Sequence, residues 1–122
     1  MLDHVTLNVA DVEAAKVFYA RALAPLGYEL TMDFVEGAGF AADRKPDFFL
    51  AQRGEPSSPV HVAFRSPDRQ TVDAFHAAAL ANGGGSDGEP GLRPHDGEGG
   101  YYAAFIRDPD GNRVEAVTFT PR

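Results

Sequence analysis

Two histidines and one glutamate in this 122-residue chain have the residue types and positions of a metal-binding set. His4 and His61 each begin an alternating run, His-Val-Thr-Leu-Asn-Val and His-Val-Ala-Phe, so both imidazoles fall on the face opposite the apolar residues. Glu115 lies among valines and alanines of a third strand-like run. A carboxylate buried there must be paired, hydrogen-bonded or metal-bound. Two imidazoles and one carboxylate suit Fe(II), Mn(II), Ni(II), Co(II) or Zn(II) and leave coordination positions open. Taken singly, each residue also fits a structural or surface role.

An internal repeat relates the two histidines. A shift of 57 residues aligns matching residue types without a gap across 24 positions, among them His4 with His61, Asp11 with Asp68, Phe18 with Phe75, and Leu23 with Leu80. Two copies indicate a duplicated unit rather than a solenoid, which needs at least three repeats. The repeat therefore predicts two halves with the same fold.

Each half is predicted to run β-α-β-β-β. In the first half a strand over 2–9 precedes a helix that begins at Asp11 and stops at Pro25 to Gly27, and strands follow at 28–34, 38–42 and 47–52. In the second half a strand at 60–65 and a helix after Asp68 precede a glycine-rich loop or loosely ordered strand at 83–100. A closing hairpin follows, with strands at 101–107 and 113–118. We expect one α+β domain with module 1 at 1–52, a polar linker at 53–59 and module 2 at 60–122.

The composition of the chain excludes some classes of binding partner. A formal net charge of −7 disfavours binding to nucleic acid or to an anionic membrane, because both need a basic face. No apolar run approaches the length of a membrane span, and strand-like alternation starts at once, so we expect no signal peptide. The absence of cysteine removes disulfides and thiolate ligands together. A cytoplasmic protein is the default expectation, because the absence of cysteine is itself compatible with any compartment.

Further polar side chains are candidates for a role in chemistry. Tyr101 and Tyr102 point to opposite faces of a strand, so only one reaches a site, where a phenol donates a proton or orients a substrate oxygen. The alternative for either tyrosine is a core or interface position. Arg93 and His95 are candidates to rim the pocket and hold an anionic substrate, and the alternative is a solvated loop. His76 is predicted to be a surface histidine of the second helix. The aspartates of 108–112 form a turn, since the spacing does not match a calcium loop.

The two histidine runs and the string Phe-Ile-Arg-Asp-Pro-Asp-Gly-Asn-Arg-Val-Glu-Ala at 105–116 resemble the vicinal oxygen chelate superfamily. Its members include glyoxalase I, fosfomycin-resistance enzymes, methylmalonyl-CoA epimerase, extradiol dioxygenases and bleomycin-resistance proteins. The resemblance implies two tandem βαβββ modules that form a curved mixed sheet around a cavity with a divalent metal, and a homodimer. It also implies His4, His61 and Glu115 as the ligands.

Residues at which this chain differs from individual members of the superfamily reduce the number of activities to expect. Glyoxalase I carries a fourth ligand, Glu or Gln, on the fourth strand, where our match places Leu50; Gln52 would replace it only in a different register. Thr6 matches a threonine beside the first ligand of fosfomycin-resistance enzymes, but Phe105 and Ala103 stand where those enzymes have Tyr and Ser. The resemblance therefore disfavours both activities. It suggests Thr6, Leu50 and Phe105 as substrate-site residues.

The leading interpretation is a metal-dependent enzyme of lyase, isomerase, transferase or dioxygenase type that acts on a small oxygen-chelating substrate. The metal would stabilise a developing oxyanion. Glu115 would be a ligand only or would also act as a base, and Tyr101 is the second catalytic candidate. The alternative is a non-catalytic binding or sequestering protein of the bleomycin-resistance type.

Overall fold

The computed structural model describes residues 1–57, 59–93 and 100–119. The first half contains β1 (Val5–Asn8), α1 (Val12–Ala22), a short 3-10 helix (Ala24–Leu26), β2 (Glu29–Phe34), β3 (Gly37–Ala41) and β4 (Phe48–Ala51). The second half contains β5 (His61–Arg65), α2 (Arg69–Ala81), β6 (Gly85–Leu92), β7 (Tyr102–Arg107) and β8 (Arg113–Thr118). The predicted β-α-β-β-β order is therefore confirmed in both halves.

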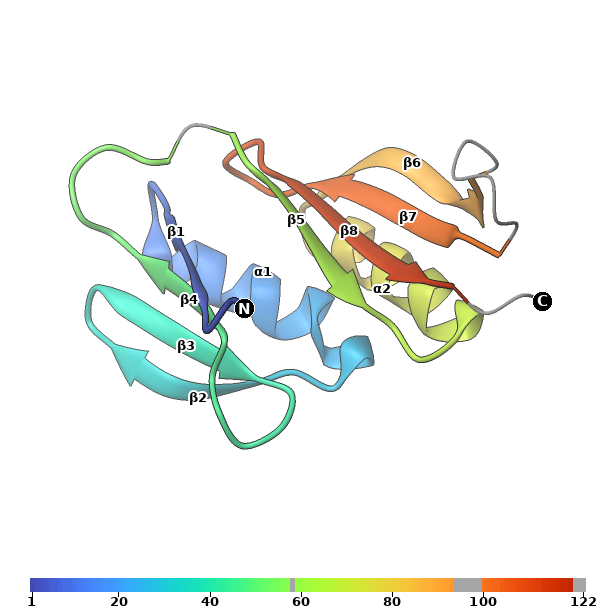
Figure 1. Cartoon of the computed structure of the whole chain (residues 1–122). Helices are drawn as coiled ribbons and strands as arrows, with labels where there is room; N and C mark the ends of the chain where they lie inside the picture. Colours follow the sequence, from blue (N-terminus) through green and yellow to red (C-terminus); the bar gives the residue numbers. More distant parts are fainter. Residues whose placement is uncertain (58, 94–99, 120–122) are drawn as a thin grey trace.

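The two halves have the same sheet topology. The strand orders are β1-β4-β3-β2 and β5-β8-β7-β6, so the first strand of each half lies at one edge, beside the last (Figure 1). That first pair is parallel in each sheet, and the other neighbours are antiparallel. A parallel pair needs a crossover connection, which the intervening helix and hairpin supply. The repeat seen in the sequence is thus a repeat of topology.

One apolar core joins the two halves. It contains side chains from both sheets and both helices, including Leu7, Phe18, Phe48, Phe64 and Phe75. The helices pack on one face of each sheet and on each other (Figure 1). Neither helix in the described ranges is long and apolar enough to cross a membrane. The face of each sheet that points away from the helices is called the open face below. His4 lies on the open face of the first half, and His61 and Glu115 lie on that of the second half.

Both helices begin at an aspartate, as the sequence predicts. The carboxylate of Asp11 accepts a hydrogen bond from the Ala14 amide at 3.1 Å, and that of Asp68 accepts one from the Thr71 amide at 2.8 Å. Such caps satisfy amides that have no partner within the helix. After α1, Gly27 takes a φ of 88°, which turns the chain into β2 at little steric cost.

The glycine-rich stretch forms an eight-residue strand, β6, that pairs with β7 through two register shifts. The looser alternative in the sequence analysis, a loop over all of 83–100, is therefore wrong for residues 85–92. Glycine explains why the pattern was ambiguous, because it lowers strand propensity while allowing another side chain to lie close against the backbone. His95 lies outside the described residues.

His76 is buried, so its prediction as a surface histidine is wrong. Only 8% of the residue is exposed, and Nε2 lies 2.9 Å from the Ser86 Oγ of β6. The helical spacing places His76 beside Phe75 on the edge of the apolar stripe. Because β6 packs against that edge, a position that looks solvent-facing in an isolated helix is covered.

The turn between β7 and β8 is held by one buried carboxylate. Asp108 is 5% exposed and accepts hydrogen bonds from the Tyr19 hydroxyl, the Asp110 amide, and the backbone and side-chain amides of Asn112. The predicted turn is confirmed. Because Tyr19 belongs to α1, the same carboxylate also ties the closing hairpin to the first half.

The hydroxyl of Tyr19 makes stability depend on alkaline pH. Burial and the neighbouring Asp108 carboxylate raise the pKa of Tyr19 well above its usual value near 10. Above pH 10 the unfolded chain releases this proton and the folded chain keeps it, so the free energy of unfolding falls as pH rises. We expect a loss of about 1.4 kcal/mol per pH unit from this residue. Urea unfolding between pH 9 and 11 should show a shallower decline for Tyr19→Phe; equal slopes would contradict this assignment.

Candidate functional site

A buried carboxylate forms the centre of the open face of the second sheet. Glu115 on β8 is 3% exposed. Its Oε1 lies 2.7 Å from His61 Nε2, and its Oε2 accepts a hydrogen bond of 2.7 Å from the Tyr101 hydroxyl. The His61 side chain is about half exposed, at 48%, whereas that of Glu115 is 4% exposed. The cluster therefore presents an accessible imidazole beside a shielded carboxylate.

Strand pairing explains how three distant residues meet. On β8, Glu115 pairs with Ala63 of β5 on one side and with Phe105 of β7 on the other. His61 lies two residues before Ala63 and therefore points to the same open face. Tyr101 immediately precedes β7, and its ring stacks on Phe119 with centroids 5.1 Å apart. Rigid strands thus fix all three side chains.

Phe105 extends the cluster along the open face. The Arg113 guanidinium lies over its ring at 4.1 Å from Cζ to the ring centre, and the Arg93 guanidinium lies over it at 5.2 Å. The His61 ring centroid is 6.0 Å away. Arg113 was not among the predicted site residues. Its position two residues before Glu115 on the same strand was the available signal, because side chains with that spacing share a face.

His4 lies on the first half, apart from the buried carboxylate. It is exposed, its Nδ1 is 2.7 Å from Asp3 Oδ1, and its ring contacts Phe49 edge-on at 5.2 Å between centroids. A cavity of about 540 Å³ between β1 and β5 is lined by His4, Thr6 and His61 among others. Cavities of this size hold small organic molecules. The two histidines thus share a cavity wall.

The predicted triad does not close within one chain. Across residues 1–57, 59–93 and 100–119, no group of three or more His, Cys, Asp or Glu side chains is close enough to hold a metal ion. The structure brings together His61 and Glu115, and adds Tyr101. His4 stands apart from that pair.

The fourth-strand position predicted for Leu50 belongs instead to Phe49. In the first sheet Phe49 pairs with Thr6, as Glu115 pairs with Ala63 in the second. Leu50 is 2% exposed and packs in the shared core on the helix side. The sequence match was displaced by one residue, which moves a strand side chain to the other face. Because Phe49 is also apolar, the fourth position still lacks a carboxylate or amide.

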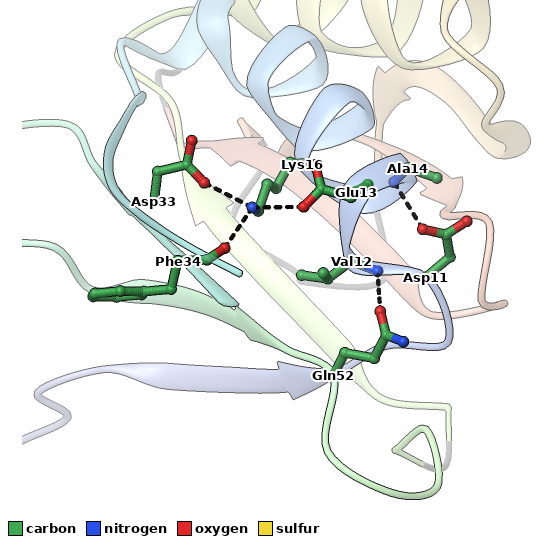
Figure 2. A network of polar contacts seen from close by, with 8 residues as sticks. All are labelled: Asp11, Val12, Glu13, Ala14, Lys16, Asp33, Phe34 and Gln52. Carbon is green, nitrogen blue, oxygen red and sulfur yellow. Dashed lines mark hydrogen bonds and ion pairs between the residues drawn. The ribbon is translucent and has the colours of Figure 1, made fainter. Parts of the chain in front are cut away.

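Gln52 has a structural role. Its Oε1 accepts a hydrogen bond of 2.8 Å from the Val12 amide at the start of α1, beside the Asp11 cap (Figure 2). In the same view Lys16 Nζ reaches Asp33, Glu13 and the Phe34 carbonyl, and so ties α1 to β2. The alternative in which Gln52 becomes a fourth ligand therefore has no support from this geometry.

Replacing Gln52 by alanine should reduce stability and leave ligand binding intact. The Val12 amide would lose its acceptor, and the loss of a helix cap costs about 1 kcal/mol. Chemical denaturation measures the stability change, and metal titration of the same variant is the control. A Gln52→Ala variant with normal stability and weakened metal binding would reverse the assignment.

The comparisons with known proteins agree with this architecture. Residues 1–116 match the family model described as the Glyoxalase/Bleomycin resistance protein/Dioxygenase superfamily. The chain belongs to this superfamily. The expected fold of two tandem βαβββ modules is confirmed.

Similar proteins match the chain over nearly its whole length. A glyoxalase/bleomycin resistance protein from Albidiferax ferrireducens T118 has a crystal structure similar to this one, with a TM-score of 0.86, 32% identity, and 97% of this chain and 98% of that chain covered. The uncharacterized protein YqjT of Bacillus subtilis (strain 168) is 30% identical over 95% of this chain and 97% of its own length. A lactoylglutathione lyase from Agrobacterium tumefaciens shares the fold, at a TM-score of 0.72 and 22% identity over 97% of this chain and 92% of its own.

Proposed function

We propose that this superfamily member is a divalent-metal-dependent enzyme that acts on a small substrate with neighbouring oxygen atoms. The observation that carries the proposal is the 2.7 Å contact between His61 Nε2 and Glu115 Oε1, at a carboxylate that is 3% exposed. A carboxylate shielded from water requires a compensating positive charge or strong hydrogen bonds. A divalent cation between this carboxylate and the imidazole would supply that charge.

The donor set fits such an ion. An imidazole nitrogen and a carboxylate oxygen are ligands for Zn(II), Fe(II), Mn(II), Ni(II) and Co(II). Adjacent ligands of a six-coordinate ion stand roughly 3 Å apart, given bonds of about 2.1 Å. The His61 and Glu115 atoms are already 2.7 Å apart, so only a small outward movement is needed. The Tyr101 hydroxyl would orient the second carboxylate oxygen.

A bound ion would act as a Lewis acid and stabilise negative charge on a substrate oxygen. Two side chains of the chain itself have proton-transfer roles in this proposal. Glu115 would accept a substrate proton on Oε2, the oxygen outside the ligand role. The Tyr101 hydroxyl, which is hydrogen-bonded to that oxygen, would donate its proton to a substrate oxygen and recover one from the protonated Glu115. Glu115 and Tyr101 are accordingly the catalytic candidates.

The third ligand, His4, is proposed to come from a second copy of the chain in a homodimer. Within one chain His4 lies on the other sheet, outside any three-residue ligand group of the described residues. Apolar side chains are also exposed on the first half and near the C-terminal end, including Met32, Phe34 and Phe119. Pairing of the open faces would cover such residues and bring the first half of one copy to the second half of the other.

A metal titration tests the enzyme proposal. Untagged protein, stripped with a chelator, should show saturable thermal stabilisation by at least one of Ni(II), Mn(II), Fe(II), Co(II) and Zn(II), because a ligand that binds only the folded state raises its stability. Stabilisation by none of these five ions would contradict the proposal.

Complementation tests the shared site. His4→Ala and His61→Ala variants should each bind metal poorly, and refolding them together should restore part of the binding, since mixed dimers contain one site with all three ligands. If mixing restores nothing, the third ligand does not come from the second copy.

A second function is supported by Phe49. This aromatic side chain occupies the position that corresponds to Glu115, beside His4. An apolar residue there favours a cavity that holds a small molecule without turnover, as in a sequestering protein. Ligand binding that is unaffected by metal removal would favour this alternative.

A further inference from the structure

Arg93 is a positioned guanidinium at the edge of the candidate site. Its backbone amide donates a hydrogen bond of 2.7 Å to the carbonyl of Tyr101, the residue whose hydroxyl reaches Glu115. Its Nη2 donates a hydrogen bond of 2.7 Å to the Glu89 carbonyl. The backbone of Arg93 and the tip of its side chain are therefore both held by hydrogen bonds, unlike a freely rotating surface arginine.

The Arg93 guanidinium lies against two glycines of β6. A Cβ at Gly91 would stand 3.2 Å from Arg93 Nη1, and one at Gly88 would stand 3.3 Å from Nη2 and 2.9 Å from the Phe105 ring. Real side chains tolerate such approaches poorly. Glycine at both positions thus allows the arginine to lie across the strand and over Phe105, with Cζ 5.2 Å from the ring centre.

The charge of Arg93 is available to a ligand. Arg107 and Arg113 both pair with Asp87, at 3.2 and 2.9 Å. Among the described residues, by contrast, no carboxylate pairs with Arg93. The hydrogen bond to the Glu89 carbonyl uses Nη2, and a guanidinium has five N–H donors, so others remain for an anion.

This guanidinium is also close to the ligand pair. Arg93 Cζ and the His61 ring centroid lie 5.2 and 6.0 Å from the centre of the same Phe105 ring. A molecule bound at His61 can therefore reach Arg93 with a second group by crossing the edge of this ring, which is itself only 6% exposed. Planar guanidinium groups recognise carboxylate and phosphoryl oxygens through paired hydrogen bonds.

We propose that Arg93 is the specificity-determining residue for an anionic group of the substrate, a carboxylate or a phosphoryl group. The substrate class is then a small molecule with oxygen atoms for the His61–Glu115 end and a separate anionic group for Arg93. The proposal rests on the proposed function only in placing the substrate on this open face.

The test uses simple anions and metal-free protein. Nitrogen-15 NMR follows the Nε–H resonance of Arg93 during titration with benzoate and with inorganic phosphate, in chelator and at constant ionic strength set by chloride. We expect a saturable change in this chemical shift with at least one anion. A response to benzoate indicates a preference for carboxylates, and a response to phosphate indicates a preference for phosphoryl groups. No saturable shift with either anion would overturn the proposal.

Matched variants locate the binding. Arg93→Gln should weaken binding of the responding anion at least about 10-fold. Isothermal titration calorimetry measures the affinity of both variants, because Arg93→Gln lacks the arginine resonance. Arg44→Gln removes the same charge from an exposed position and should leave binding unchanged. Equal weakening in both variants would mean that binding reflects net charge, and unchanged binding in Arg93→Gln would mean that the anion binds elsewhere; either result would refute the assignment. Because no metal is present, failure here is distinguishable from failure of the metal proposal.

Discussion

Replacing Glu115 by glutamine should weaken divalent-metal binding by more than roughly 100-fold, since loss of a mere supporting contact to a ligand already costs 10- to 100-fold. Glutamine keeps the shape of the side chain and an oxygen that accepts the Tyr101 hydrogen bond, but it lacks the negative charge. The fold should therefore survive. Isothermal titration calorimetry with the ion that most stabilises the wild-type protein measures the effect.

The control for Glu115→Gln is Glu55→Gln, which removes one carboxylate from an exposed position between β4 and β5. It should bind metal as the wild-type protein does. His61→Ala should resemble Glu115→Gln, because the two side chains are in direct contact. Unchanged affinity in both Glu115→Gln and His61→Ala would show that any bound ion lies elsewhere.

Replacing Asp108 by alanine should be the most destabilising single change in the hairpin, with a loss of about 3–5 kcal/mol. Four donors would lose their acceptor: the Tyr19 hydroxyl, the Asp110 amide and both amide groups of Asn112. Most of these groups are shielded from water, so leaving them without a partner carries a desolvation cost. Urea unfolding at neutral pH, read by circular dichroism, measures the loss.

Asp110→Ala is the matched change in the same turn. Asp110 is partly exposed, and within residues 1–57, 59–93 and 100–119 its side chain accepts only a long hydrogen bond of 3.3 Å, from the Ala10 amide. We expect a loss below about 1 kcal/mol for this variant. If Asp110→Ala and Asp108→Ala were equally destabilised, the buried carboxylate would not be the organising group of the turn.

The fold was predictable from sequence because local and global signals agree. Alternation placed His4 and His61 opposite the apolar face, and the repeat required both halves to fold alike. The aspartates at both helix starts were readable for the same reason, since capping depends on neighbours three residues away. The family resemblance then predicted the arrangement of two tandem βαβββ modules.

The wrong or incomplete predictions concern contacts that the pattern of a single helix or strand does not contain. Strand register decides whether Leu50 or Phe49 reaches the open face, and in two adjacent apolar residues composition does not distinguish them. The burial of His76 depends on β6, which follows α2 along the chain but lies outside the helical pattern. Arg93 was visible as a loop cation, and Gly88 and Gly91 lie only five and two residues before it, but the pattern does not show that its side chain folds back over them.

The site was predictable only in part for the same reason. Glu115 and His61 lie on strands that pair directly, so a correct topology brings them together. His4 lies on a separate sheet, and the chain alone does not join it to them in the described residues. An intermolecular arrangement leaves no local trace in a sequence. The proposed sharing of ligands between two copies of the chain is accordingly the part of the site that the sequence predicts least.

The most direct measurement of the central proposal is an anomalous difference map from crystals of the protein loaded with the ion that gives the greatest thermal stabilisation, collected at that metal's absorption edge. We predict a peak beside His61 Nε2 and Glu115 Oε1. A peak at another place, or a featureless map from crystals of protein shown to retain the metal, would contradict it.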